Sequence, residues 1–169
     1  MIESYIRDIK DFPKEGILFK DITPLLNHWE ARQEVLNTFK VNLPNIKIDK
    51  VVGVESRGFF FGILLAQELE AGFVPVRKKG KLPFDTISAS YELEYGTDSL
   101  EIHTDSIQKG ENILIHDDVL ATGGTIKAVT ELVEKLGGNI VQINFLMELE
   151  FLNGREKINQ YPTFSAIKY

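Results

Sequence analysis

Residues 113–138 constrain the fold of this chain more than any other segment. They open with an apolar run, Ile113 to Ile115, which predicts a buried strand. Two adjacent carboxylates, Asp117 and Asp118, come next, and a turn of small residues, Ala121 to Thr125, follows. Apolar residues then recur at helical spacing until two glycines end the helix: Ile126, Val129, Leu132, Val133, Leu136, Gly137 and Gly138. The order is therefore strand, acidic pair, glycine turn and helix.

The turn at 121–125 has the features of a phosphate-binding site. Gly123 and Gly124 let the backbone approach a ligand closely, and the free N–H groups at the start of a helix attract anions. The hydroxyls of Thr122 and Thr125 add further donors. The segment is not a P-loop, because no Gly-Lys-[Ser/Thr] ending is present, and it does not match G-x-G-x-x-G. A phosphate group would fit here.

Asp117 and Asp118 distinguish this turn from a plain anion site. They would repel a phosphate beside them unless they face something else. Sugar hydroxyls and a hydrated Mg²⁺ ion are the natural candidates. The alternative is an ordinary strand-to-helix turn whose acids only start the helix. An acidic pair directly before the glycines favours the first interpretation, so the sequence predicts a sugar-phosphate site.

The bulk composition limits the classes of function. A chain of 169 residues fits one domain with a sizeable core. The formal net charge of −6 argues against general nucleic-acid binding, which needs a basic face, but is compatible with a local basic pocket. Without cysteines there are no disulfides or thiolate metal sites. The longest apolar run, 58–66, is too short to span a membrane, and no secretory signal opens the chain, so we expect a cytoplasmic protein.

Two further strands are followed by residues suited to an anionic ligand. The strand 50–54 leads into Glu55-Ser56-Arg57-Gly58, and the strand 73–76 leads into four cations within Arg77 to Lys81. Ligands of open parallel sheets bind at the carboxyl ends of strands, so these turns and the acidic pair would share one rim. An exposed salt-bridge arginine at Arg57 and a solvated charge run are the alternatives. The position and sign of the run favour a pyrophosphate clamp.

The other segments are assigned more coarsely. Residues 1–11 are expected to form a short amphipathic helix, and 28–42 a longer one. The apolar segment 12–26 is broken by prolines and glycine, and either packs against the domain or covers a flat apolar ligand as a lid. Residues 86–95 alternate as a half-exposed strand and 99–103 can pair back, which makes this hairpin a candidate mobile cover. Toward the end of the chain we expect a strand at 140–147, a helix at 152–158 and a strand at 163–169.

Residues 113–125 resemble the phosphoribosyl-pyrophosphate (PRPP) loop of the type I phosphoribosyltransferases over their whole length. One departure is His116, which stands where the family usually has an aliphatic residue, and we interpret it as a core residue. Further motifs narrow the resemblance to the adenine phosphoribosyltransferases, in that family's order and over nearly the whole chain: Phe12 to Pro24, Glu55 to Phe59, Arg77 to Pro83, Ala89 to Gly96 and Gly154 to Lys157. Lys20 stands where many relatives have Arg, and Glu55 where others have Asp.

The resemblance implies an α/β fold in a single domain spanning 1–169. A parallel twisted sheet flanked by helices would carry a small hood, about 1–30, and a flexible β-arm, about 83–104. The chain would act as a homodimer in purine salvage, converting adenine and PRPP to AMP and pyrophosphate. Mg²⁺ would be carried mainly by substrate oxygens and waters rather than by a protein metal site.

The resemblance also implies roles for individual residues. The 5′-phosphate would bind at Ala121, Thr122, Gly123, Gly124 and Thr125, and the ribose hydroxyls at Asp117 and Asp118. Pyrophosphate would be surrounded by Ser56, Arg57, Arg77, Lys78 and Lys81, with Arg77 and its neighbours serving the partner subunit's site. Adenine would be framed by Leu18, Phe19 and Lys20. Glu94, which would handle a proton of the purine ring, and Arg57 are the expected catalytic residues.

Two other functions share the loop. A phosphoribosyltransferase for 6-oxopurines or orotate would differ around 17–26 and 89–96. A non-enzymatic PRPP-sensing regulator would keep the loop and lose the chemistry. The regulator predicts a nucleic-acid-binding module or a lost arm, and this chain has neither an extra domain nor a basic face, so an enzyme is the favoured interpretation.

Overall fold

A computed structural model describes residues 2–93 and 95–169 of the chain. It divides into two compact units, Met1–Asn42 and Leu43–Tyr169. The predicted hood lies within the first unit, and the predicted arm and phosphate turn lie within the second.

The first unit begins with a short 3-10 helix, η1 (Ile2–Tyr5), followed by strand β1 (Arg7–Lys10). The helix expected over 1–11 is therefore wrong for its second half. β1 pairs antiparallel with β2 (Leu18–Asp21), so that Arg7 lies opposite Asp21. Arg7 Nη2 donates to Asp21 Oδ2 at 2.7 Å, and Lys20 Nζ donates to Asp8 Oδ1 at 2.7 Å. These pairs join residues far apart in sequence, which a search for helical spacing does not detect.

Two helices complete the first unit. α1 (Thr23–Asn27) begins with Pro24 in its first turn, a position that suits proline. α2 (Trp29–Val41) confirms the helix expected over 28–42. Its buried residues recur every three or four positions and form one apolar stripe: Ala31, Val35, Leu36 and Phe39.

The second unit is built on a seven-stranded sheet with the order β5-β6-β4-β3-β7-β8-β9. Five strands run parallel: β3 (Lys50–Val54), β4 (Gly72–Lys78), β7 (Asn112–Leu120), β8 (Asn139–Glu148) and β9 (Thr163–Lys168). The hairpin of β5 (Thr86–Glu92) and β6 (Thr97–His103) is added antiparallel to β4. This mostly parallel sheet with flanking helices confirms the predicted fold class.

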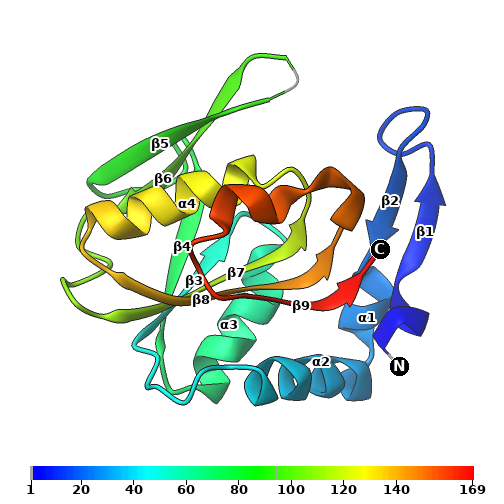
Figure 1. The fold of residues 1–169 in the computed structure, drawn as a ribbon, viewed down its shortest axis with the longest axis horizontal. Helices are drawn as coiled ribbons and strands as arrows, with labels where there is room; N and C mark the ends of the chain where they lie inside the picture. The colour runs from blue at the N-terminus through cyan, green and yellow to red at the C-terminus, as the bar shows by residue number, and fades with distance from the viewer. Residues whose placement is uncertain (1, 94) are drawn as a thin grey trace. The chain divides into compact units, whose positions relative to one another are not determined.

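Helices α3 (Gly58–Glu68) and α4 (Gly124–Lys135) cover opposite faces of the sheet (Figure 1). The core contains apolar side chains of the central strands and the inner face of α4, among them Val52, Val76, Ile115, Leu120, Val129, Val133, Ile143 and Phe145. Two short 3-10 helices, η2 (Glu150–Leu152) and η3 (Gly154–Ile158), connect β8 to β9. None of the described helices is long and apolar enough to cross a membrane.

Candidate active site

The order of the central strands places three turns at one rim of the sheet. β4, β3 and β7 are direct neighbours and parallel. Their carboxyl ends therefore lead into the basic run, the Glu55–Gly58 turn and the phosphate turn on the same side of the unit. The rim expected from the sequence is present.

The phosphate turn is shorter than the sequence suggests, because β7 continues as far as Leu120. Asp117 and Asp118 thus lie within the strand rather than in a loop. Only Ala121 to Gly123 connect the strand to α4, which begins at Gly124. Gly123 caps this helix with φ at 80°, in the left-handed region that glycine adopts at little cost.

A small cavity of about 70 Å³ lies inside this turn. Its wall includes Asp117, Thr122, Gly123 and Thr125. The volume is about that of two waters in the liquid, which suits one phosphate group rather than a whole nucleotide. An added Cβ at Gly124 would have no heavy-atom neighbour closer than 3.9 Å among the described residues, so the protein itself leaves space at this glycine.

The two aspartates differ in their partners. Asp118 is buried and forms an ion pair with Arg57. Asp117 Oδ1 accepts a hydrogen bond from the Asp118 backbone N–H at 2.9 Å, and it would lie 2.8 Å from a Cβ at Gly58. The start of α3 is therefore pressed against the acidic pair. Burial and the neighbouring Asp118 charge raise the pKa of Asp117 well above its ordinary value.

Three residues of the basic run contact the carboxylate of Glu55. The Glu55 carboxylate accepts from Arg77 Nη2 at 3.2 Å, from Lys81 Nζ at 2.7 Å and from the Lys78 backbone N–H at 2.7 Å. Burial would raise the pKa of Glu55, but these three donors outweigh it and hold the pKa below its ordinary value. Arg77 and Lys81 therefore meet at one carboxylate on the rim, although Lys81 remains half exposed.

The arm approaches the phosphate turn through Tyr91 of β5. The Tyr91 hydroxyl donates to Asp98 Oδ2 at 3.3 Å. Asp98 in turn pairs with Lys78 Nζ at 2.9 Å. A cavity of about 470 Å³ between the arm and α4 is lined by Tyr91, Gly124 and Lys157, among others. The arm therefore contacts the basic run through Asp98 and Lys78, and it lies beside the first turn of α4.

The predicted site also includes Glu94 and the segment 18–20. Glu94 lies outside the described residues. Leu18, Phe19 and Lys20 belong to β2 of the first unit, where the Phe12 and Phe19 rings meet edge to face with centroids 5.0 Å apart. Leu18 is 48% exposed.

Sequence reasoning missed three contributors. Glu55 was noted only as an acidic position, but it is the residue that gathers the cations. Tyr91 is expected only as part of the half-exposed strand 86–95, but it hydrogen-bonds Asp98 and lines the cavity beside α4. The Nζ of Lys157 lies 4.0 Å from a Cβ built on Gly124, and the only signal for it was the unexplained motif Gly154 to Lys157. In the part of the chain that the structure describes, no three acidic or histidine residues are grouped closely enough to hold a metal ion.

Comparisons with known proteins agree with this geometry. The family described as phosphoribosyl transferase domain matches residues 34–166. An adenine phosphoribosyltransferase of Flavobacterium johnsoniae is 76% identical over 168 residues, 99% of either chain. The crystal structure of adenine phosphoribosyltransferase from Thermoanaerobacter pseudethanolicus superposes with a TM-score of 0.96 at 53% identity, over 99% of this chain and 98% of that one. The Saccharomyces cerevisiae enzyme, complexed with an imino-altritol bisphosphate and adenine, gives 0.93 at 47% identity, over 97% and 95%.

Proposed function

We propose that this chain, which belongs to the adenine phosphoribosyltransferase family, transfers the 5-phosphoribosyl group from PRPP to adenine. The products are AMP and pyrophosphate, a reaction of purine salvage. The observation that carries the proposal is the juxtaposition of the phosphate turn, the acidic pair and the Glu55-centred cations on one rim. PRPP is a ribose with phosphate at one end and pyrophosphate at the other. Its three parts match the order of the phosphate turn, the acidic pair and the cations along the rim.

The 5′-phosphate and ribose would be held by β7 and the start of α4. The backbone N–H groups of Ala121 to Thr125 point to the anion, and helix α4 favours negative charge at its first turn. Asp117 and Asp118 face the ribose hydroxyls. Arg57, paired with Asp118, keeps this carboxylate from adding a full negative charge beside the phosphates.

Pyrophosphate would be met by Ser56, Arg57, Arg77, Lys78 and Lys81. In the reaction the bond from the ribose anomeric carbon to pyrophosphate breaks, and N9 of adenine forms the new bond on the opposite face. Negative charge develops on the leaving pyrophosphate as the bond loosens. Cations fixed beforehand stabilise that charge without rearranging during the step.

Adenine would be framed by the Leu18–Lys20 segment, and Glu94 would take or share the proton that the purine loses. Mg²⁺ fits the donor set as an ion carried mainly by PRPP and pyrophosphate oxygens, with Asp117 and Asp118 able to accept hydrogen bonds from its waters. When bound, it would neutralise phosphate charge. A homodimer in the cytoplasm, with Arg77 and its neighbours reaching the partner subunit's site, completes the proposal.

A base panel tests this function. Purified protein with Mg-PRPP is offered adenine, hypoxanthine, guanine or orotate, and nucleotide formation is followed by chromatography. The 6-amino group of adenine donates a hydrogen bond where the oxo group of the other purines accepts one. A site built for adenine leaves a buried polar group unpaired with those bases, which discriminates by roughly 10⁴ or more. Comparable turnover of hypoxanthine would overturn the choice of adenine, and no turnover of any base would overturn the enzyme.

A further inference from the structure

The turn at Gly154 forms an outer wall of the phosphate turn. An added Cβ at Gly123 would collide with the Gly154 carbonyl oxygen. An added Cβ at Gly154 would collide with the Ala121 carbonyl oxygen and lie 3.1 Å from the Gly123 nitrogen. The two backbones are thus in direct contact, and neither can move toward the other. The path of the chain at Gly154 therefore fixes the space in which residues 121–123 can lie.

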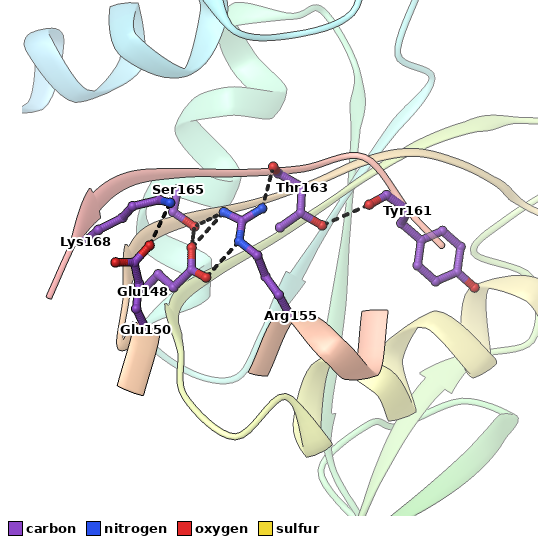
Figure 2. Close-up of polar contacts among 7 residues, drawn as sticks. All are labelled: Glu148, Glu150, Arg155, Tyr161, Thr163, Ser165 and Lys168. Carbon is purple, nitrogen blue, oxygen red and sulfur yellow. Dashed lines mark hydrogen bonds and ion pairs between the residues drawn. The ribbon is translucent and has the colours of Figure 1, made fainter. Parts of the chain in front are cut away.

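The residue after Gly154 is anchored to the sheet. Arg155 donates through Nε and Nη2 to the two oxygens of Glu148, each at 2.7 Å, and through Nη1 to the Thr163 carbonyl oxygen at 3.0 Å. Ser165 Oγ donates to Glu148 Oε2 at 2.7 Å. Figure 2 shows the planar guanidinium held between the Glu148 carboxylate of β8 and residues of β9. A bidentate pair of this kind fixes orientation as well as position.

Glu148 itself is tied to the phosphate turn by the sheet. It lies opposite Leu120, the last residue of β7, in the parallel pairing of β7 and β8. The next residue, Leu149, donates its backbone N–H to the Leu120 carbonyl oxygen at 2.9 Å. Glu148 is 4% exposed, so its charge is costly to bury unless it is paired. Glu148 therefore connects two segments beside the phosphate turn. It is linked to the end of β7 at Leu120 by the sheet, and to the Gly154 turn by Arg155.

We infer that Glu148 and Arg155 are positioning residues for the phosphate turn, acting through the backbone of Gly154. This inference rests on the proposed function, because the ligand they serve is the phosphate of the sugar substrate. Without the guanidinium fork, the Gly154 turn loses its attachment to β8 and β9. The backbone of Ala121 to Gly123 is then no longer held by its contact with Gly154. Its N–H groups are less well oriented, and affinity for the phosphate falls.

The test separates positioning from simple stability. Arg155→Met leaves the buried Glu148 carboxylate unpaired, and is expected to lower the melting temperature as well as phosphate affinity. Arg155→Met/Glu148→Met replaces the pair with apolar side chains, which restores stability in comparable buried pairs, but the anchor remains absent. Arg155→Lys keeps the charge and loses the fork, so it should retain stability and recover only part of the affinity.

The matched control is Lys168→Gln. It breaks the ion pair between Lys168 Nζ of β9 and Glu150 Oε1, 2.8 Å apart (Figure 2). Lys168 lies opposite Glu148 in the sheet, so this variant removes a neighbouring positive charge but leaves the Arg155 fork in place. Calorimetric titration with ribose 5-phosphate and with Mg-PRPP measures affinity. The KM for PRPP and the KM for adenine are measured in parallel, since a positioning role in this turn moves the first and not the second.

We expect the double variant to melt within a few degrees of the wild type and to bind both probes about ten- to a hundredfold more weakly. The KM for adenine should stay within about twofold, because on the proposed function the base does not bind at the phosphate turn. The control should match the wild type, because it keeps the Arg155 fork. A double variant, or Arg155→Lys, that binds both probes like the wild type would overturn the inference and leave the proposed function intact. Wild-type protein that binds neither probe would overturn the proposed function, and this inference with it.

Discussion

His116 Nδ1 lies 2.7 Å from Asn144 Oδ1, and both side chains are completely buried on neighbouring parallel strands. The two residues are direct partners in the register of β7 and β8. The imidazole N–H donates to the amide oxygen, which accounts for a histidine in a strand that is otherwise apolar. Burial lowers the pKa of His116 from 6.5 to about 4, and the bond to Asn144 opposes this only in part. The prediction of a core histidine agrees with this position.

The first prediction concerns the pH dependence of stability. Because the folded pKa lies below the unfolded value, the unfolded chain binds more protons between pH 6.5 and about 4. The unfolding free energy should therefore fall as the pH is lowered through that window, by about 3 kcal/mol in total from this residue. Denaturant unfolding at several pH values measures it. His116→Val should show a flatter slope, and the exposed His28→Asn should not. Parallel slopes for the wild type and His116→Val would contradict the assignment.

The second prediction concerns the pair itself. His116→Val leaves the buried Asn144 oxygen without its donor and should cost about 1–3 kcal/mol at pH 7. His116→Val/Asn144→Val removes both polar groups and should recover much of that loss. A double-mutant cycle by denaturant unfolding gives the coupling. Additive losses would mean that the two side chains act independently.

The third prediction distinguishes two adjacent glycines. Gly124→Val should lower the melting temperature less than Gly123→Ala does, because a Cβ at Gly124 meets only ordinary van der Waals contacts. It should nevertheless abolish PRPP binding by blocking the approach of phosphate to the backbone. Gly123→Ala should lower stability by about 1 kcal/mol or more, because of its positive φ and the collision with Gly154. Calorimetry with Mg-PRPP and a thermal melt separate the two effects. If Gly124→Val bound Mg-PRPP with wild-type affinity, the assignment of a phosphate site to this turn would be wrong.

The fourth prediction concerns the cations around Glu55. Arg77→Ala and Lys81→Ala should each weaken pyrophosphate binding by about tenfold or more, the value of one charge-assisted hydrogen bond. Lys79→Ala is the matched control, because Lys79 is in the same run and has no described contact with Glu55. Titration with Mg-pyrophosphate measures all three. Equal losses in all three would indicate a diffuse field of positive charge rather than a built site.

A mixing experiment addresses the subunit that these cations serve. Arg77→Ala protein and an Asp117→Asn/Asp118→Asn double variant are each impaired on the proposed mechanism. If Arg77 acts in the partner subunit's site, exchange of subunits creates hybrids with one intact site, and activity rises above that of either variant alone. No recovery after verified exchange would assign Arg77 to its own chain.

The fifth prediction concerns Glu94. Glu94→Gln keeps the size of the side chain and removes its charge, so kcat should fall by about 10²–10⁴, the usual contribution of a positioned general base. PRPP affinity should change little. Glu92→Gln, two residues earlier in the sequence, should cost much less. Single-turnover rates decide between them, and wild-type turnover by Glu94→Gln would leave proton removal to water.

Local pattern was sufficient to predict much of this fold. The helix at 126–136 and the parallel strands before the three rim turns are encoded in consecutive residues, so spacing and glycines reveal them. The features that escaped depend on partners distant in sequence. The helix expected over 1–11 is wrong at β1, because this strand depends on its pairing with β2, which brings Arg7 to Asp21. The role of Glu55 depends on Arg77 and Lys81, 22 and 26 residues away. A pattern search over a few consecutive residues does not include both partners of these contacts.

The Glu55 carboxylate has a consequence for turnover. Arg77 and Lys81 are already paired with the Glu55 carboxylate. An anionic ligand that binds them must therefore compete with Glu55 for their positive charge. The free energy of binding is then the difference between two attractions of similar kind. On the proposed function, the same competition acts after the reaction. As pyrophosphate leaves, Glu55 can pair again with Arg77 and Lys81, and this pairing favours release of the product.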